Sequence, residues 1–125
     1  MRVAILTISD AASRGERTDT SGDAIAGWCA IRKAEVVERG IVGDDVGEIV
    51  GRLCPWCDDD AADLVLTTGG TGLSARDVTP EATRAAIERD APGIAERIRM
   101  LGAERFPRAA LSRGLAGVRA RTLIV

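Results

Sequence analysis

The sequence contains no histidine and no tyrosine, and it has only one phenylalanine and two tryptophans. Without histidine the chain can build neither a Ser-His-Asp triad nor a Cys-His nucleophile, and no zinc centre with imidazole ligands. The few aromatic side chains and the net charge of −2 argue against a nucleic-acid surface, which needs a basic face or a stacking platform. Any chemistry therefore has to come from carboxylates, arginines, hydroxyls, thiols or backbone N–H groups.

Long apolar runs are missing as well. No stretch reaches about 18 consecutive apolar residues, so we expect no membrane span. The first predicted strand begins at Arg2 with no apolar signal-peptide segment before it, which predicts a cytoplasmic protein. The 125 residues, 46% of them hydrophobic and 29% charged, suit one globular domain over residues 1–125.

Short apolar runs alternate with helical patterns along the chain, which is typical of an α/β protein whose sheet is covered on both faces. Strands are predicted at residues 3–8, 35–42, 64–67 and 122–125. Helices are predicted to begin near Ser21, after Asp44-Asp45, at Thr79 and at Pro92. Residues 9–21 follow no regular period and are predicted to form a long loop, and loops of this length are often functional.

The predicted helices carry apolar side chains at three- and four-residue spacing, which marks the faces expected to pack on the sheet. These stripes are Ile25, Trp28 and Cys29; Val46, Ile49, Val50 and Leu53; and Ile94, Ile98 and Leu101. Thr79 followed by Pro80 and Glu81 predicts a helix start with the Thr79 hydroxyl as its cap.

The segment Thr-Thr-Gly-Gly-Thr-Gly at residues 67–72 is the strongest local signal. Three glycines directly after a buried strand allow positive φ and let a ligand approach the backbone. Successive N–H groups in such a turn form an anion-binding nest, and the threonine hydroxyls add donors. A tight turn without a ligand is the alternative. The pattern favours a phosphate or another anion, which Arg14, Arg76 or Arg113 could also reach.

Three aspartates follow the predicted strands or the glycine turn: Asp10, Asp44 and Asp77. Ligands of parallel sheets bind at the carboxyl ends of the strands, and carboxylates gathered there beside phosphates suit Mg²⁺. Each aspartate also has a plain structural interpretation. Asp44 could cap its helix, Asp10 could form a loop turn, and Asp77 could pair with Arg76 or Arg84 on the surface.

Cys54-Pro55-Trp56-Cys57 has the spacing of a thiol–disulfide motif. The two cysteines continue the apolar stripe of the preceding helix rather than opening a helix after a strand, so buried or helix-end thiols are favoured over redox chemistry. Pro55 is expected to kink or end that helix. With three cysteines and no histidine, a four-ligand zinc site would need a carboxylate or another subunit.

Several segments occur together in one order along the whole chain. They are Ile8-Ser9-Asp10, Asp19-x-Ser21-Gly22, Asp44, residues 67–72, Arg76-Asp77-Val78-Thr79-Pro80-Glu81-Ala82, Pro92-Gly93 and Leu111-Ser112-Arg113. In this respect the sequence resembles the MogA/MoaB family of molybdenum cofactor biosynthesis proteins, the molybdopterin adenylyltransferases. The run from the glycine turn through residue 82 is the most specific part of the resemblance.

The resemblance implies a three-layer α/β/α fold with a mostly parallel sheet, and a cytoplasmic homotrimer. It implies adenylyl transfer from MgATP to the terminal phosphate of molybdopterin, with release of pyrophosphate, and a downstream molybdate-insertion protein as partner. Asp44 and Asp77 would be the catalytic acids and would hold Mg²⁺. The residues implied to bind substrate and phosphate are Ser9, Asp10, Thr68, Gly69, Gly70, Thr71, Gly72 and Ser112.

The sequence departs from the family pattern at three places. Relatives continue beyond the last predicted strand with an Asn-(Leu/Met)-Pro-Gly segment and a final helix, so we expect this chain to be shortened at its C-terminus and to lack one pocket wall. Gly102 stands where relatives often carry a serine near the pterin, and Gly43 replaces a common proline. Two alternatives stay open: a non-catalytic molybdopterin-binding scaffold, and a CinA-like nucleotide-processing domain.

Overall fold

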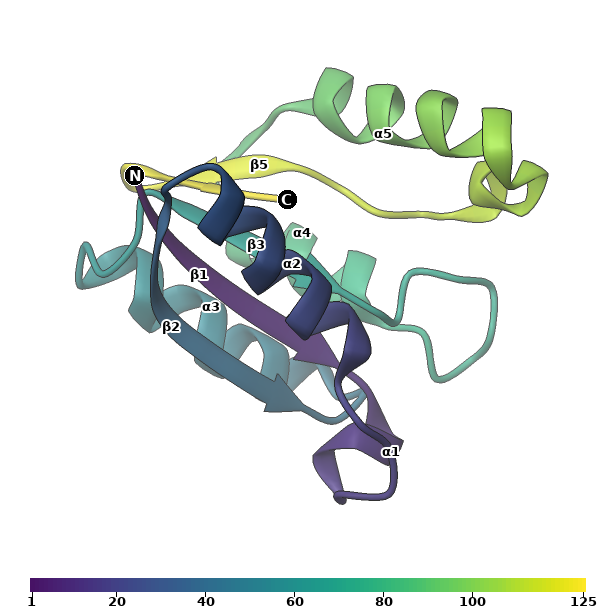
Figure 1. Cartoon of the computed structure of the whole chain (residues 1–125), viewed down its shortest axis with the longest axis horizontal. Coiled ribbons are helices and arrows are strands. Elements are labelled where there is room, and N and C mark those ends of the chain that lie inside the picture. The colour runs from purple at the N-terminus through teal and green to yellow at the C-terminus, as the bar shows by residue number, and fades with distance from the viewer.

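Six strands and five α-helices alternate along the chain, and the computed structural model describes all 125 residues (Figure 1). The strands are β1 (Arg2–Ile8), β2 (Glu35–Val42), β3 (Leu64–Thr68), β4 (Arg89–Asp90), β5 (Gly117–Arg119) and β6 (Thr122–Ile124). The α-helices are α1 (Asp10–Ser13), α2 (Thr20–Ile31), α3 (Val46–Asp58), α4 (Thr79–Ala86) and α5 (Pro92–Arg105), and the short 3-10 helix η1 spans Pro107–Leu111. Every predicted strand and helix is present.

The strands form one mixed sheet in the order β2-β1-β3-β6-β5-β4. β1 runs parallel to both β2 and β3, β3 runs parallel to β6, and β5 is antiparallel to its two neighbours. Ile8 at the end of β1 lies opposite Val42 of β2, and Thr7 lies opposite Thr68 of β3. The carboxyl ends of three neighbouring strands therefore meet at one edge of the sheet, and the segments that follow them are brought together there.

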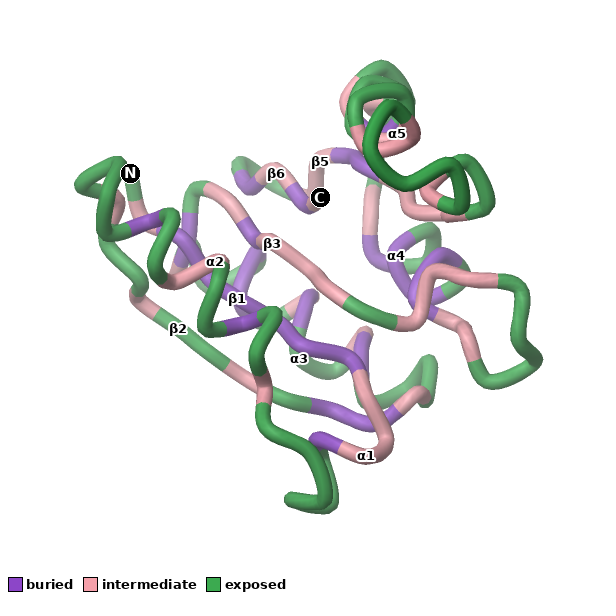
Figure 2. The backbone as a smooth tube through the Cα atoms, turned by 45° about the vertical axis from the view of Figure 1, so that its right-hand side comes forward, coloured by how far each residue is buried: buried purple, intermediate pink, exposed green.

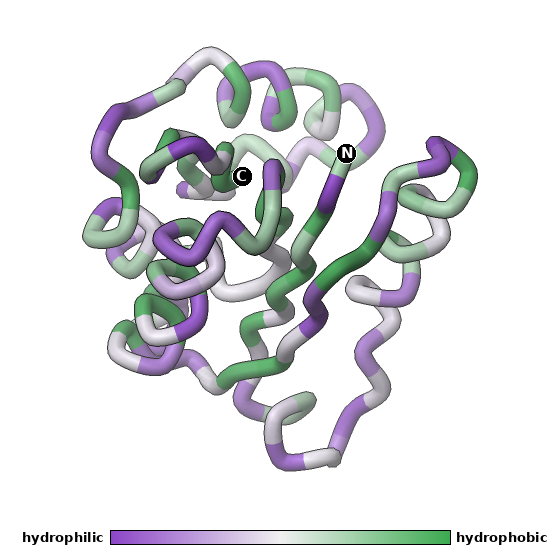
Figure 3. The backbone as a smooth tube through the Cα atoms, turned by 90° about the vertical axis from the view of Figure 1, so that its left-hand side faces the viewer, coloured by the Kyte–Doolittle hydropathy of each residue, from purple (hydrophilic) through white to green (hydrophobic).

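The core lies on both faces of β1, whose side chains alternate between them. Val3 and Ile5 pack with Cys29 of α2 on one face. Leu6, on the other face, belongs to the larger cluster with Leu53 of α3. Figure 1 shows α2 on one side of the sheet and α3 and α4 on the other, and Figure 3 shows hydrophobic residues concentrated along the central strands. The expected three-layer α/β/α fold is thereby confirmed.

Two of the predicted apolar stripes do not face the core as expected. Ile98 and Leu101 of α5 are 54% and 46% exposed, because α5 packs mainly against η1 rather than on the sheet (Figure 2). Trp28 of α2 is 44% exposed and lies against the guanidinium of Arg32, 5.3 Å from the ring centroid. These three side chains therefore lie outside the core, whereas Cys29 is fully buried.

Local structure differs from the predictions at three further points. Residues 9–21 contain the short helix α1, which Ser9 caps by accepting the N–H of Ala12 at 3.2 Å. Pro55 does not end α3, because the helix continues to Asp58. The strands β4 and β5 and the helix η1 are not predicted from the sequence.

None of the helices combines the length and apolar character that crossing a bilayer requires.

Candidate functional site

The glycine- and threonine-rich turn follows β3 directly, as predicted. Gly69 and Gly70 adopt φ angles of +95° and +67°. A Cβ at Gly69 would collide with the carbonyl oxygen of Ile8, and one at Gly70 would collide with the Thr79 hydroxyl. Both positions therefore need glycine, for backbone conformation and for space.

Thr79 at the start of α4 fixes this turn. Its hydroxyl donates to the carbonyl of Gly69 at 2.7 Å, and its backbone N–H donates to the carbonyl of Gly70 at 3.0 Å. Val78 occupies the N-cap of α4, without a side-chain hydrogen bond. The prediction that the Thr79 hydroxyl caps α4 is wrong, because this hydroxyl donates to the carbonyl of Gly69 in the glycine turn instead.

The backbone N–H groups of residues 69–72 have no acceptor within the protein. None of these four groups donates to a backbone carbonyl or to a side chain, whereas the N–H groups of Thr67 and Ser74 both do. Unpaired N–H groups in succession, on a turn with positive φ, form a concave set of donors for an anion. This observation supports the predicted phosphate nest.

A pocket of about 310 Å³ opens between this turn and the segment that follows β1; we call it the acidic pocket. Its walls come from the ends of β1 and β3, the loop before α2 and the acids after β2 and the glycine turn. The predicted site residues that line it are Ser9, Asp44, Thr68, Gly69, Gly70 and Asp77. The topology thus brings together both predicted catalytic acids and half of the glycine turn.

Asp44 keeps one carboxylate oxygen free for a ligand. It does not cap α3, because Asp45 occupies the N-cap and accepts the N–H of Glu48 at 2.9 Å. Oδ2 of Asp44 accepts the N–H of Asp10 at 3.0 Å, and no protein donor reaches Oδ1. Oδ1 lies at the turn, 3.0 Å from the point where a Cβ on Gly70 would stand.

Asp77 is arranged in the same way. Its Oδ2 accepts the N–H of Ser74 at 3.0 Å, and no protein donor reaches its Oδ1. Neither arginine expected as a surface partner pairs with it, since Arg76 pairs with Asp10 and Arg84 with Asp90. Asp77 is therefore a pocket acid rather than half of a surface ion pair.

The two free carboxylate oxygens suit a hard divalent cation. Mg²⁺ in nucleotide enzymes is held by one or two carboxylates together with phosphate oxygens of the substrate. No group of three or more His, Cys, Asp or Glu side chains is placed to hold a metal ion. Asp44 and Asp77 thus fit a cation that phosphate oxygens would also ligate, rather than a metal bound by the protein alone.

Asp10 lies beside the acidic pocket but does not line it. Its Oδ1 accepts the N–H of Asp44 at 2.9 Å, and its Oδ2 accepts two hydrogen bonds from Arg76, at 2.8 and 3.1 Å. The Asp44 N–H, and after it the Arg76 guanidinium, hold the pKa of Asp10 below its ordinary value. The expectation that Asp10 binds phosphate is not supported by this geometry, because its carboxylate is already fully engaged.

Asp19 lines the acidic pocket and is absent from the predicted site residues. Its side chain is only 7% exposed and accepts hydrogen bonds from Thr7 Oγ1, the N–H of Gly22 and Arg39, each at 2.9 Å. Burial raises the pKa of Asp19, but the bonds from Arg39, Gly22 and Thr7 outweigh it and leave the pKa lowered. Two sequence signals pointed to this wall, which also includes Arg17: the length of the predicted loop 9–21 and the family segment Asp19-x-Ser21-Gly22.

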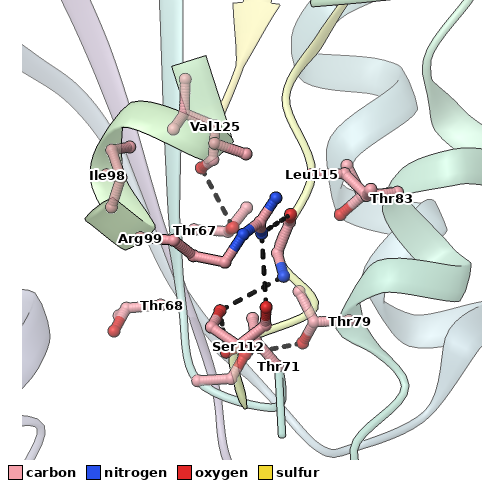
Figure 4. Close-up of a pocket in the computed structure, with 13 residues that line it drawn as sticks. Thr67, Thr68, Thr71, Thr79, Thr83, Ile98, Arg99, Ser112, Leu115 and Val125 are labelled. Carbon is pink, nitrogen blue, oxygen red and sulfur yellow. Dashed lines mark hydrogen bonds between the residues drawn. The ribbon is translucent and has the colours of Figure 1, made fainter. Parts of the chain in front are cut away.

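A second pocket, of about 210 Å³, lies on the other side of the turn, and five threonines line it (Figure 4). We call it the threonine pocket; its threonines are Thr67, Thr68, Thr71, Thr79 and Thr83. It shares Thr68 and Gly69 with the acidic pocket. Two separate cavities therefore meet at the beginning of the glycine turn.

Ser112 lies in the threonine pocket, as its predicted role requires. Its Oγ donates to Thr71 Oγ1 at 3.3 Å and accepts the N–H of Gly114 at 3.2 Å. Arg99 of α5, which the sequence did not single out, donates to the carbonyls of Ser112 and Gly114 at 3.3 and 2.7 Å (Figure 4). Gly72 lines neither pocket.

The remaining residues of interest lie away from both pockets. Gly102 sits in α5, where an added Cβ would stand 3.1 Å from Ala109. Cys29, Cys54 and Cys57 are free thiols, and Cys29 and Cys57 are buried. Burial raises the pKa of the Cys57 thiol, which disfavours the reactive thiolate. The structure therefore agrees with the favoured interpretation of Cys54-Pro55-Trp56-Cys57 as helix residues.

Comparison with known proteins identifies relatives over nearly the whole chain. Residues 4–124 match the family model described as "Probable molybdopterin binding domain". Molybdopterin adenylyltransferase of Helicobacter pylori strain J99 is 39% identical over 127 aligned residues, which cover 100% of this chain and 72% of the relative. The Escherichia coli K12 protein of the same name is 37% identical, and the chain covers 65% of its length.

Solved structures agree with these sequence relatives. The molybdopterin biosynthesis enzyme MoaB of Thermus thermophilus superimposes with a TM-score of 0.91 at 51% identity, covering 98% of this chain and 77% of that one. The family match over residues 4–124 therefore includes nearly all of the sheet, the glycine turn and both pocket acids. The chain belongs to the molybdopterin-binding domain family of the molybdenum cofactor biosynthesis proteins.

Proposed function

We propose that the chain is a molybdopterin adenylyltransferase acting in molybdenum cofactor biosynthesis. An oxygen of the terminal phosphate of molybdopterin would attack the α-phosphorus of ATP. The bond from that phosphorus to the bridging oxygen would break, giving adenylylated molybdopterin and pyrophosphate. The observation that carries the proposal is the meeting of two pockets at Thr68 and Gly69, beside unpaired N–H donors, since the reaction joins two phosphorylated molecules.

The roles of the chain's own residues follow from this arrangement. The N–H groups of Gly69, Gly70 and Thr71, which line the pockets, would bind phosphate oxygens and orient them for in-line transfer. Asp44 and Asp77 would hold Mg²⁺ through their free oxygens. When bound, the cation would neutralise charge that develops on the phosphates. Ser112 and Thr71 would contact the substrate in the threonine pocket.

No histidine is needed for this chemistry. Phosphoryl and nucleotidyl transfer depend mainly on positioning and charge stabilisation, and an attacking phosphate oxygen carries no proton that a strong base must remove. Carboxylates, backbone N–H groups and hydroxyls, which remain in a chain without histidine, are the groups found at the site.

The test is incubation of the protein with molybdopterin, ATP and Mg²⁺. We expect equal amounts of pyrophosphate and adenylylated molybdopterin, and loss of both with Asp77→Asn, a variant of nearly the same size. Omission of Mg²⁺ should give the same loss. Tight molybdopterin binding without release of pyrophosphate by the wild-type protein would instead indicate a scaffold of the same family.

The proposal also includes a cytoplasmic location, transfer of the product to a molybdate-insertion protein and a homotrimer. The family resemblance supports these features, and the exposed apolar side chains of α5, Ile98 and Leu101, supply surface for a contact between copies. Sedimentation equilibrium tests the assembly, because a homotrimer has three times the chain mass of 13.1 kDa.

A further inference from the structure

Arg113 joins both ends of the loop that carries Asp77. We call residues 72–77 the acid loop. Nε of Arg113 donates to the carbonyl of Gly72 at 2.8 Å, and Nη2 donates to the carbonyl of Asp77 at 2.8 Å. Nη1 donates to Glu81 Oε1 at 2.6 Å. One guanidinium thus connects the first residue of the acid loop, its last residue and helix α4.

The acid loop has few other restraints. Its residues 73–76 are exposed and belong to no helix or strand. The bonds between Ser74 and Asp77 lie within the loop, and the pair of Arg76 with Asp10 is its only other side-chain link to the rest of the chain. Arg76 is 66% exposed, and such a pair restrains a loop weakly.

Arg113 is itself held in place by its neighbours. Its backbone N–H donates to the carbonyl of Thr71 at 2.8 Å. Arg99 donates to the carbonyls of Ser112 and Gly114 on either side of it. The Arg113 side chain therefore extends from a backbone that is held at Arg113 itself and at both neighbouring residues.

We propose that Arg113 is a positioning residue that holds the acid loop so that Asp77 stays in the wall of the acidic pocket with Asp44. The restraint on the loop is independent of the proposed function; its consequence for Mg²⁺ and turnover rests on that function. Arginine suits this role because its planar guanidinium remains charged and presents donors in fixed directions. A lysine could reach one of the three acceptors at a time but could not span all three.

Arg119 provides a matched control. It also makes three hydrogen bonds, two to the Asp58 carboxylate at 2.9 and 2.8 Å and one to the carbonyl of Ala86 at 3.0 Å. Its side chain is 24% exposed, against 35% for Arg113. It lines neither pocket, so Arg119→Ala removes a comparable set of bonds away from the site.

The experiment compares wild-type protein with Arg113→Ala, Arg113→Lys and Arg119→Ala. The first readout is amide hydrogen exchange at Ser74 and Asp77, whose N–H groups are bonded within the acid loop. We expect exchange there to be about tenfold faster in Arg113→Ala, partly restored in Arg113→Lys and unchanged in Arg119→Ala. Equal exchange rates at these amides in all four proteins would overturn the proposal.

The second readout is the Mg²⁺ dependence of pyrophosphate release. In Arg113→Ala, kcat should fall by about 10- to 100-fold, as expected for a displaced catalytic group, and the Mg²⁺ concentration for half-maximal rate should rise. Arg119→Ala should keep both values even if its melting temperature falls. Unchanged Mg²⁺ dependence in Arg113→Ala would contradict the role in positioning Asp77. A wild-type protein without turnover would refute the proposed function, while the exchange rates would still decide whether Arg113 restrains the loop.

Discussion

Asp10 and Asp44 exchange hydrogen bonds, each donating its backbone N–H to the carboxylate of the other. Asp10 N lies 3.0 Å from Asp44 Oδ2, and Asp44 N lies 2.9 Å from Asp10 Oδ1. These bonds tie the segment after β1 to the segment after β2. They also fix the orientation of the Asp44 carboxylate and leave its Oδ1 without a protein donor. Asp10 thus serves the site by orienting the acid beside it.

Loss of the Asp10 carboxylate should therefore weaken catalysis without abolishing it. In Asp10→Ala the N–H of Asp44 and the Arg76 guanidinium both lose their acceptor. We expect kcat for adenylyl transfer to fall by about 10- to 100-fold, through misplacement of Asp44. Asp44→Ala, which removes the pocket acid itself, should lower kcat further than Asp10→Ala does. Steady-state pyrophosphate release measures both variants, and a larger loss in Asp10→Ala than in Asp44→Ala would mean that Asp10 contacts substrate.

Gly70→Ala should destabilise the protein and impair the turn. The alanine Cβ would collide with the Thr79 hydroxyl at a φ of +67°, which alanine rarely adopts. We expect the free energy of unfolding to fall by about 1–3 kcal/mol. Gly51→Ala is the control, because Gly51 lies inside α3 with open space at its Cβ. The free energy of unfolding of Gly51→Ala should rise by about 0.5–1 kcal/mol. Urea unfolding compares the two variants. A change in the free energy of unfolding of the same sign in both would contradict this account of the turn.

Acid stability should depend on Asp63. The side chain and then the backbone N–H of Arg2 lower the pKa of Asp63 from 3.8 to about 2. Because the folded pKa is the lower one, the unfolded chain binds more protons between these values. The stabilisation is complete above about pH 4 and is lost as the pH falls towards 2. The free energy of unfolding of Asp63→Asn should fall less steeply than that of wild type in this window, and equal slopes in acid titrations would refute the effect.

The thiols should react slowly in the folded protein. Cys29 and Cys57 are buried, and burial raises the pKa of Cys57, whereas Cys54 is half-buried. With a thiol-specific disulfide reagent we expect Cys54 to react first in the native protein. Reaction of all three thiols should require denaturant. Adenylyl transfer should survive modification of Cys54. Rapid reaction of Cys57 in native protein would revive the redox interpretation of this segment.

Sequence patterns predicted the parts of the fold that local residues determine. The bounds of β2 were predicted without error, because Val36, Val37, Ile41 and Val42 favour a strand and Gly43 follows its last residue. The antiparallel pair of β4 and β5 was missed, since strands of two and three residues carry no period and depend on pairing with each other. The exposed position of Ile98 follows from where α5 packs, which its own spacing does not encode.

The site was predicted to the extent that it lies at strand ends. The glycine turn, Asp44 and Asp77 were placed together correctly, because parallel strands bring their carboxyl ends to one edge. The resemblance implied ligand contact for Asp10, and Arg113 was one of three arginines that could reach a phosphate, whereas both side chains form hydrogen bonds within the protein. The partners of both side chains lie 32 or more residues away along the chain, so no local pattern could reveal them.

The position of β6 has a consequence for synthesis on the ribosome. This strand, residues 122–124, lies inside the sheet between β3 and β5, although it is made after both. Until it emerges, the nascent chain presents β3 with one unpaired edge, and β4 and β5 have no attachment to the rest of the sheet. Unpaired strand edges favour aggregation. The sheet can therefore close only after β6 has left the ribosome, and until then these strand edges are open to chaperones and to other chains.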